Sequence, residues 1–259
     1  SSKSTSYMQF SEIDAMKIRK IAATRLRIID NRCDETMLQQ TRKIKPTRRS
    51  VSGIYPFRND TSVPYESTLE RDFLIRAEFF LDVLDVIAQP VQIPFVASNG
   101  NTYSYTPDYL VYYRLGTQCY DEYPRPLLVE VKPEAAWREN WRDWFPKWKA
   151  ARRYAHGQGW QFRIYDESRI RDNVFMNVNF LEQYKRMNFP NEESQYVIDS
   201  VQEMGSAPIH YLLARHFMGL YRAQGIAHIW HLIATRRLDC DVSKGLNEFC
   251  EVWIPTYVY

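Results

Sequence analysis

Cysteine is scarce in this chain, and paired cysteine motifs are absent. The four cysteines, Cys33, Cys119, Cys240 and Cys250, are widely spaced, and no two of them form a C-x-x-C pair. This spacing indicates neither a disulfide framework nor a paired zinc knuckle. A reducing compartment is therefore the natural expectation for the protein.

Long apolar runs and a glycine-rich phosphate loop are also absent. Charged residues interrupt every apolar stretch before membrane-spanning length, and the first residues lack the apolar segment of a secretory signal, so we expect no membrane segment. Without a Walker-type loop, any ATP dependence must come from a partner. Lys plus Arg total 34 against 31 for Asp plus Glu. This balance permits local basic surfaces, and hence nucleic acid, without proving it.

Residues 1–60 are basic. Ser11–Ile29 mixes apolar positions with Lys and Arg and predicts a basic helix, whereas Thr41–Phe57 carries further cations with Pro46, Gly53 and Pro56 among them. The second segment is typical of a loop-rich arm. We therefore assign residues 1–60 to an N-terminal basic helix and arm.

The order helix, strand, strand, strand, helix, strand follows over residues 61–167. The expected helices are Glu66–Val86 and Glu134–His156, and the expected strands are Val91–Phe95, Tyr103–Tyr113, Leu127–Val131 and Trp160–Tyr165. This order predicts an α/β core with a mixed sheet of about four strands. In the second helix, Trp141, Phe145 and Trp148 recur at helical spacing, which favours core packing over a base-stacking platform.

Residues 168–259 are mostly helical by pattern. Four helices are expected between Asp172 and Arg236, and short β-prone pieces around Gly245 follow them. Helices followed by a hairpin predict a small winged-helix-like domain. Its last helix could bind DNA or a protein. Its apolar residues are needed for packing, and Arg236 and Arg237 alone are weak evidence for DNA binding.

Two carboxylates and a lysine fall where adjacent strands of the core meet. Asp108 lies on the second expected strand, and Glu130 and Lys132 close the third. Side chains alternate faces along a strand, so Glu130 and Lys132 point the same way while Val131 points into the core. The carbonyl of Val131 remains available to a metal.

Phosphodiester hydrolysis requires an activated water and stabilised charge on the phosphate and the leaving oxygen, which Mg²⁺ on oxygen ligands supplies. Asp108, Glu130 and the Val131 carbonyl are the candidate ligands, with Glu70 completing a second metal site, and Lys132 is the candidate cation at the attacking water. The structural alternative is a turn at Asp108, a surface pair at the strand edge and a solvated Glu70. Placing charges in an otherwise apolar strand costs free energy, and this cost favours the catalytic interpretation over the structural alternative.

Ordered motifs give this chain a family resemblance. They are Ser67-Thr68-Leu69-Glu70, Val83-Leu84-Asp85-Val86 with Gln89, Thr106-Pro107-Asp108-Tyr109-Leu110-Val111, Val129-Glu130-Val131-Lys132-Pro133 and Arg152-Arg153-Tyr154. In this order they resemble TnsA, the restriction-endonuclease-like PD-(D/E)xK subunit of heteromeric cut-and-paste transposases. The resemblance implies catalytic roles for Glu70, Asp108 and Lys132. Position 130, which can be Gln in the family, is Glu here.

The resemblance further implies a bacterial, cytoplasmic endonuclease that nicks the 5′ strands at transposon ends. Its expected partners are double-stranded DNA, a TnsB-like transposase and a TnsC-like AAA+ ATPase, the last at the C-terminal domain. Its expected cofactor is Mg²⁺, two ions per site, with Mn²⁺ able to substitute. Two alternatives stay open, namely a stand-alone restriction or repair endonuclease and a catalytically inactive nuclease fold that serves as a binding module.

Overall fold

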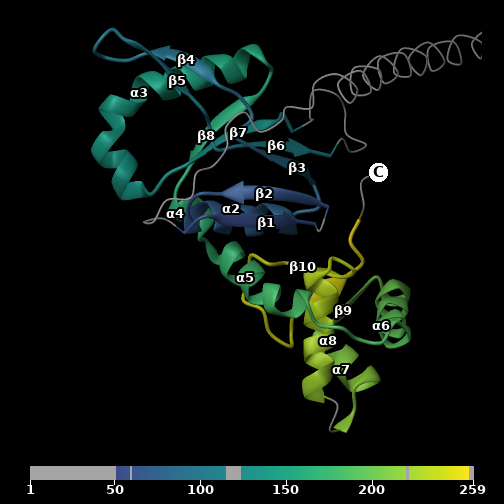
Figure 1. Ribbon diagram of the computed structural model, residues 1–259. Helices are drawn as coiled ribbons and strands as arrows, with labels where there is room; N and C mark the ends of the chain where they lie inside the picture. The colour runs from purple at the N-terminus through teal and green to yellow at the C-terminus, as the bar shows by residue number, and fades with distance from the viewer. Residues whose placement is uncertain (1–50, 59, 115–123, 220–221, 257–259) are drawn as a thin grey trace, which may run out of the picture. The chain divides into compact units, whose positions relative to one another are not determined.

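A four-stranded mixed sheet forms the centre of the fold (Figure 1). The computed structural model describes residues 51–58, 60–114, 124–219 and 222–256. The sheet has the order β3 (Val83–Ala88), β6 (Tyr109–Tyr113), β7 (Leu127–Val131) and β8 (Gln161–Tyr165). The first three strands pair antiparallel, and β7 pairs parallel with β8. All five residues of β7 are buried, as its nearly continuous apolar sequence predicts for an inner strand.

Two separate hairpins accompany the sheet. Strand β1 (Gly53–Phe57) pairs with β2 (Thr61–Tyr65), and β4 (Ile93–Val96) pairs with β5 (Thr102–Tyr105). In the second hairpin Gly100 has a φ of 80°, a backbone conformation that glycine adopts at little steric cost, so it allows the turn between β4 and β5. The first hairpin replaces the loop expected for the end of the N-terminal arm.

Two helices pack on the sheet and the hairpins. Helix α2 (Thr68–Phe79) contacts β1, β2, β3 and β7, whereas α3 (Glu134–Gly157) contacts β4 and β8. Figure 1 shows α2 with the β1–β2 hairpin on one side of the sheet and α3 with the β4–β5 hairpin on the other. The β4–β5 hairpin and α3 therefore lie together above the same part of the sheet.

Three sequence expectations are corrected here. The expected helix Glu66–Val86 ends at Phe79, and its last part forms β3, because pairing with β6 outweighs local propensity. The expected strand Tyr103–Tyr113 is divided into β5 and β6 around Pro107 and Asp108. The predicted sheet of four strands is present, but it contains β3 in place of β4. The basic helix expected over Ser11–Ile29 lies outside the described residues.

The C-terminal part is helical with a small sheet. Its helices are α4 (Glu167–Ile170), α5 (Asn173–Lys185), α6 (Asn191–Met204), α7 (Ile209–His216) and α8 (Arg222–Ala234). Short strands β10 (Asp239–Cys240), β11 (Glu251–Trp253) and β9 (Ser206–Pro208) pair antiparallel in that order. The predicted α/β class with a helical C-terminal part is confirmed. Within the described ranges, no helix has both the length and the apolar character needed to cross a bilayer.

Ion pairs join α2 to the C-terminal part. They are Arg76–Asp172 at 2.9 Å, Arg171–Asp72 at 2.8 Å and Lys185–Glu78 at 2.5 Å. Asp172 is also the N-cap of α5, where its side chain accepts a hydrogen bond from the Phe175 N–H. The same carboxylate therefore starts α5 and holds it against α2.

Candidate active site

Asp108 lies immediately before β6, opposite the end of β7. Because β6 and β7 are antiparallel, with Tyr109 facing Val129, the start of β6 meets the last residues of β7. The Val131 N–H donates to Asp108 Oδ2 over 2.7 Å, and the Asp108 carbonyl accepts from the Gln89 N–H over 2.8 Å. Asp108 is thus fixed through both its side chain and its backbone.

Glu130 is almost fully buried, with 1% of its surface exposed. The Tyr105 hydroxyl donates to Glu130 Oε2 over 2.6 Å, and two ammonium groups, those of Lys132 and Lys147, each lie 3.4 Å from Oε1. Burial of a lone carboxylate would be costly, so these partners make the position tolerable. Both oxygens of Glu130 are therefore engaged by protein groups.

Lys132 stands between the two carboxylates. Its Nζ donates to Asp108 Oδ2 over 3.4 Å and to the Val131 carbonyl over 3.1 Å, and it lies 3.4 Å from Glu130 Oε1. Burial by itself lowers the pKa of Lys132, but Asp108, Glu130 and Glu70 raise this pKa above its usual value. The Lys132 side chain is accordingly a cation at neutral pH.

Glu70 occupies the first turn of α2 and closes a variant of the capping box, in which its carboxylate accepts from the residue before the N-cap. Ser67 is the N-cap and accepts from the Glu70 N–H, while Glu70 Oε1 accepts from the Ser67 hydroxyl and Oε2 from the Glu66 N–H over 2.8 Å. The Tyr109 hydroxyl donates to the same Oε2 over 3.3 Å. Glu66 precedes the helix, so the expected start of this helix at Glu66 is wrong and Glu66 is not on the helix with Glu70.

The site carries an excess of buried negative charge. Burial is the largest cause that raises the pKa of Asp108, and Glu130 and Glu70 raise it further, whereas Lys132 and the Val131 N–H lower it. Burial also raises the pKa of Glu70, against the lowering effect of the Glu66 N–H and Lys132. Carboxyl groups that are costly to ionise side by side mark a place where a cation is favoured.

The structure brings three sequence-predicted residues into direct contact, and adds two others. Asp108, Glu130 and Lys132 are in contact, as strand alternation predicts. Glu70 interacts electrostatically with Asp108 and is linked to the group by Tyr109. The two added residues are Tyr105 and Lys147, which sequence analysis does not identify as part of the site. No local motif marks either residue, because one comes from the β4–β5 hairpin and the other from α3.

One carboxylate oxygen of the site is without a hydrogen-bond partner, but the described residues contain no complete set of metal ligands. Among the described residues, Asp108 Oδ1 has no hydrogen-bond partner, and the Asp108 side chain is 16% exposed. The Val131 carbonyl, a predicted ligand, accepts a hydrogen bond from Lys132. Across the described part of the chain, no group of three His, Cys, Asp or Glu side chains is arranged to hold a metal ion.

Family models match both parts of the chain. Residues 81–167 match the model described as TnsA-like endonuclease N terminal, and residues 169–242 match the model described as TnsA endonuclease C terminal. The chain belongs to the TnsA-like endonuclease family. The first match contains Asp108, Glu130 and Lys132 but begins after Glu70. No curated protein matches the chain. Membership in the TnsA-like family supports an endonuclease that acts in transposition, with DNA as its substrate.

Proposed function

We propose that this TnsA-like protein hydrolyses DNA with Mg²⁺ at the cluster of Glu70, Asp108, Glu130 and Lys132. The observation that carries the proposal is the meeting of Asp108, Glu130 and Lys132 at the junction of β6 and β7. Burying carboxylates and a lysine costs desolvation free energy, and apolar residues would stabilise the same position equally well. The charged residues are therefore better explained by function than by stability. The same group is a suitable donor set for phosphodiester hydrolysis.

The donor set fits a hard divalent cation. Asp108, Glu130 and the Val131 carbonyl would hold one ion, Glu70 would contribute to a second, and oxygen ligands of this kind favour Mg²⁺, with Mn²⁺ as a substitute. When bound, such ions activate water and offset charge on the leaving oxygen. The raised pKa of Asp108, caused in part by Glu130 and Glu70, supports a cation at this position.

Lys132 is the residue proposed to orient the attacking water and to offset negative charge that develops on the phosphate. Its ammonium already lies within 3.4 Å of both Asp108 and Glu130. A charge held in place by these carboxylates requires little reorganisation during the reaction. The elevated pKa of Lys132 makes it an electrostatic group rather than a proton acceptor.

In transposition, the proposed reaction is nicking of the 5′ strands at transposon ends beside a TnsB-like transposase and a TnsC-like ATPase. Family membership supports this setting. We further propose three functional regions, namely the arm of residues 1–60, the nuclease core of residues 61–167 and a winged-helix-like region of residues 168–259. In the last region, helices α6 to α8 with the β9–β11 sheet offer a surface to the ATPase.

The decisive experiment follows each strand of end-containing donor DNA with Mg²⁺, with and without the partner transposase. We expect Asp108→Ala to abolish 5′ nicking, and Asp143→Ala, on the exposed side of α3, to retain it. Nicking by the Asp108→Ala protein at the wild-type rate, with the fold unchanged, would refute the assignment. Efficient cleavage without the partner would indicate a stand-alone endonuclease. Absence of cleavage in every condition would indicate an inactive binding module.

A further inference from the structure

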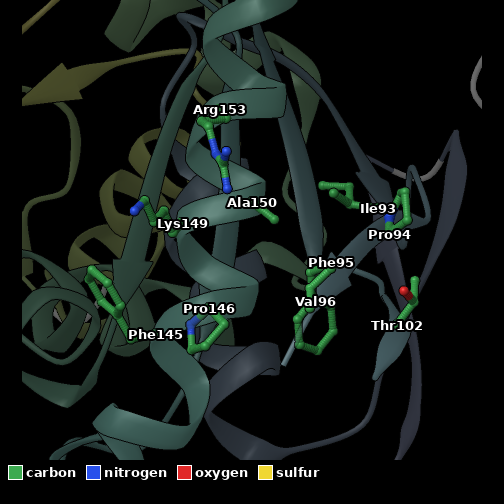
Figure 2. Close-up of a pocket in the computed structure, with 10 residues that line it drawn as sticks. All are labelled: Ile93, Pro94, Phe95, Val96, Thr102, Phe145, Pro146, Lys149, Ala150 and Arg153. Carbon is green, nitrogen blue, oxygen red and sulfur yellow. The ribbon is translucent and has the colours of Figure 1, made fainter. Parts of the chain in front are cut away.

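A pocket of about 670 Å³ lies between the β4–β5 hairpin and α3. We call it the hairpin–helix pocket. Figure 2 shows its two walls, with the strand of Ile93–Val96 on one side and the helix segment of Phe145–Arg153 on the other. The volume falls within the roughly 300–1,000 Å³ of pockets that hold small molecules, so it can accommodate a nucleotide. Its wall is mostly apolar and includes Phe95, Phe145 and Pro146.

The helix wall is more exposed than its sequence predicts. The aromatic stripe of α3 was expected to face the core, but Trp141 is 47% exposed and Phe145 is 51% exposed, while Trp148 is buried. Pro146 lies within α3 and removes one helical hydrogen bond at this point. The core-packing interpretation is therefore wrong for the middle of α3. Exposed aromatic rings near a nuclease centre are candidates for stacking on bases.

The pocket includes two charged residues, Lys149 and Arg153. Lys149 and Arg153 are exposed, and neither has an ion pair or a hydrogen bond within the described residues. They are four positions apart on α3, so they lie on the same side of the helix. Lys132 and Lys147, by contrast, are paired with carboxylates. Unpaired cations beside an apolar surface suit a ligand that carries both a phosphate and a flat ring.

The pocket and the candidate active site are built partly from the same two elements, the β4–β5 hairpin and α3. Tyr105, which donates to Glu130, belongs to the hairpin that forms one wall and pairs directly with Ile93. Lys147, which contacts Glu130 on the other side, belongs to the helix that forms the second wall. A DNA strand that is bound at Asp108 and Glu130 and runs along the hairpin and α3 would bring its neighbouring nucleotides to this pocket.

We propose that the hairpin–helix pocket receives an unpaired base of the DNA strand next to the phosphate that is cut. The inference rests on the proposed nuclease function, from which it takes DNA as the substrate. Phe95 stacks on the base, and Lys149 and Arg153 neutralise the adjoining phosphates. Unpairing a base costs free energy, and a stacking wall compensates for it. Charge complementarity favours DNA over an apolar peptide, which would leave both cations without a role.

The test compares two DNA duplexes that carry a transposon end. One has a single unpaired iodouracil beside the cleavage site, and the other is fully paired. Binding to the full-length protein is measured by fluorescence anisotropy with a chelator present, so that cleavage does not contribute. We expect preference for the unpaired base, and photocrosslinking of the iodouracil to Phe95 or Phe145, located by mass spectrometry.

Variants separate stacking from general attraction to phosphates. Phe95→Leu keeps apolar bulk but removes the ring, and we expect it to weaken binding of the unpaired duplex by about five-fold or more. Arg153→Gln is expected to weaken it as well. Arg152→Gln removes an exposed cation of the same helix that does not line the pocket, and it should keep the preference. Thermal unfolding of each variant checks that the hairpin remains folded.

Several outcomes would overturn the pocket assignment. These are equal binding of the two duplexes by the wild-type protein, unchanged preference in Phe95→Leu, and a crosslink outside β4, β5 and α3. Loss of association with the partner transposase in Phe95→Leu, with DNA binding unchanged, would make the pocket a protein site instead. Failure of the nuclease proposal is distinguishable, since cleavage with Mg²⁺ would then be absent while the binding preference measured with the chelator persists.

Discussion

Lys147 Nζ lies 3.4 Å from Glu130 Oε1 and is surrounded by the rings of Tyr105, Trp144 and Trp148. The ring centroids are 5.0, 4.6 and 5.8 Å from the ammonium group. Aromatic faces attract a cation and also limit its motion. The rings therefore hold the Lys147 ammonium group against Glu130. In this way helix α3 helps to fix the position of Glu130 on β7.

Lys147→Met is expected to lower stability and cleavage together. It leaves Glu130 with fewer charged partners in a buried position, which should cost about 2 kcal/mol of unfolding free energy. Misplacement of Glu130 should slow cleavage about ten-fold or more. Urea unfolding and single-turnover cleavage measure the two effects. Arg152→Met, an exposed change on the same helix, should stay within about 0.5 kcal/mol of wild type. Equal unfolding curves for the two variants would contradict the role given to Lys147.

Tyr105→Phe isolates the hydrogen bond to Glu130. The ring stays in place, but Glu130 Oε2 loses a donor at 2.6 Å, and a hydrogen bond to a charged group contributes about 1.5–3 kcal/mol. We expect a loss of unfolding free energy near the lower end of that range, because Lys132 and Lys147 remain. The matched control is Tyr103→Phe on the same strand, whose side chain is 47% exposed. If both variants unfold alike, Tyr105 does not stabilise Glu130.

The contacts among Asp108, Glu130 and Lys132 could be predicted because they depend on local rules. Strand alternation places Glu130 and Lys132 on one side of β7, and antiparallel pairing brings the start of β6 to its end. Tyr105 and Lys147 could not be found in this way. Their positions depend on how a separate hairpin and α3 pack on the sheet, which no periodicity in the sequence records.

Strand β3 shows a second limit of sequence analysis. Leu81 and Leu84 continue the helical spacing of α2, and a short apolar run fits a helix and a strand equally well. The structure decides for a strand because Val86 and Ala88 pair with β6 and are buried. In the middle of α3 the helix itself is predicted correctly, but the burial of its aromatic residues is not. The helical spacing of Trp141 and Phe145 does not indicate whether another element covers them.

Glu70 has two roles that can be separated by substitution. As part of the capping box it stabilises the start of α2, and as a proposed metal ligand it acts in cleavage. Gln also closes a capping box, so Glu70→Gln should leave thermal stability nearly unchanged while cleavage is lost. Ser67→Ala should do the opposite, with about 1 kcal/mol of stability lost and cleavage retained. Cleavage by Glu70→Gln at the wild-type rate would reduce Glu70 to a structural residue.

His228 is a buried histidine in the C-terminal part. It stacks on Phe189, with ring centroids 4.3 Å apart, and its Nε2 lies 2.7 Å from the Ser194 hydroxyl. Burial, together with smaller contributions from His231 and Arg237, lowers the pKa of His228 from 6.5 to about 4. The folded protein therefore holds His228 neutral over a pH range in which the unfolded chain binds a proton there.

Stability should consequently fall as the pH is lowered from 6.5 towards 4. In that window the unfolded state binds more protons than the folded state, so acid favours unfolding, and above the unfolded pKa the effect vanishes. Between pH 7 and pH 5 we expect His228 to account for a loss of about 2 kcal/mol. Urea unfolding at both pH values measures the loss, and His228→Gln should reduce it by that amount, whereas the exposed control His210→Gln should not. An identical pH dependence in wild type and His228→Gln would show that His228 titrates alike in both states, which its burial against Phe189 should prevent.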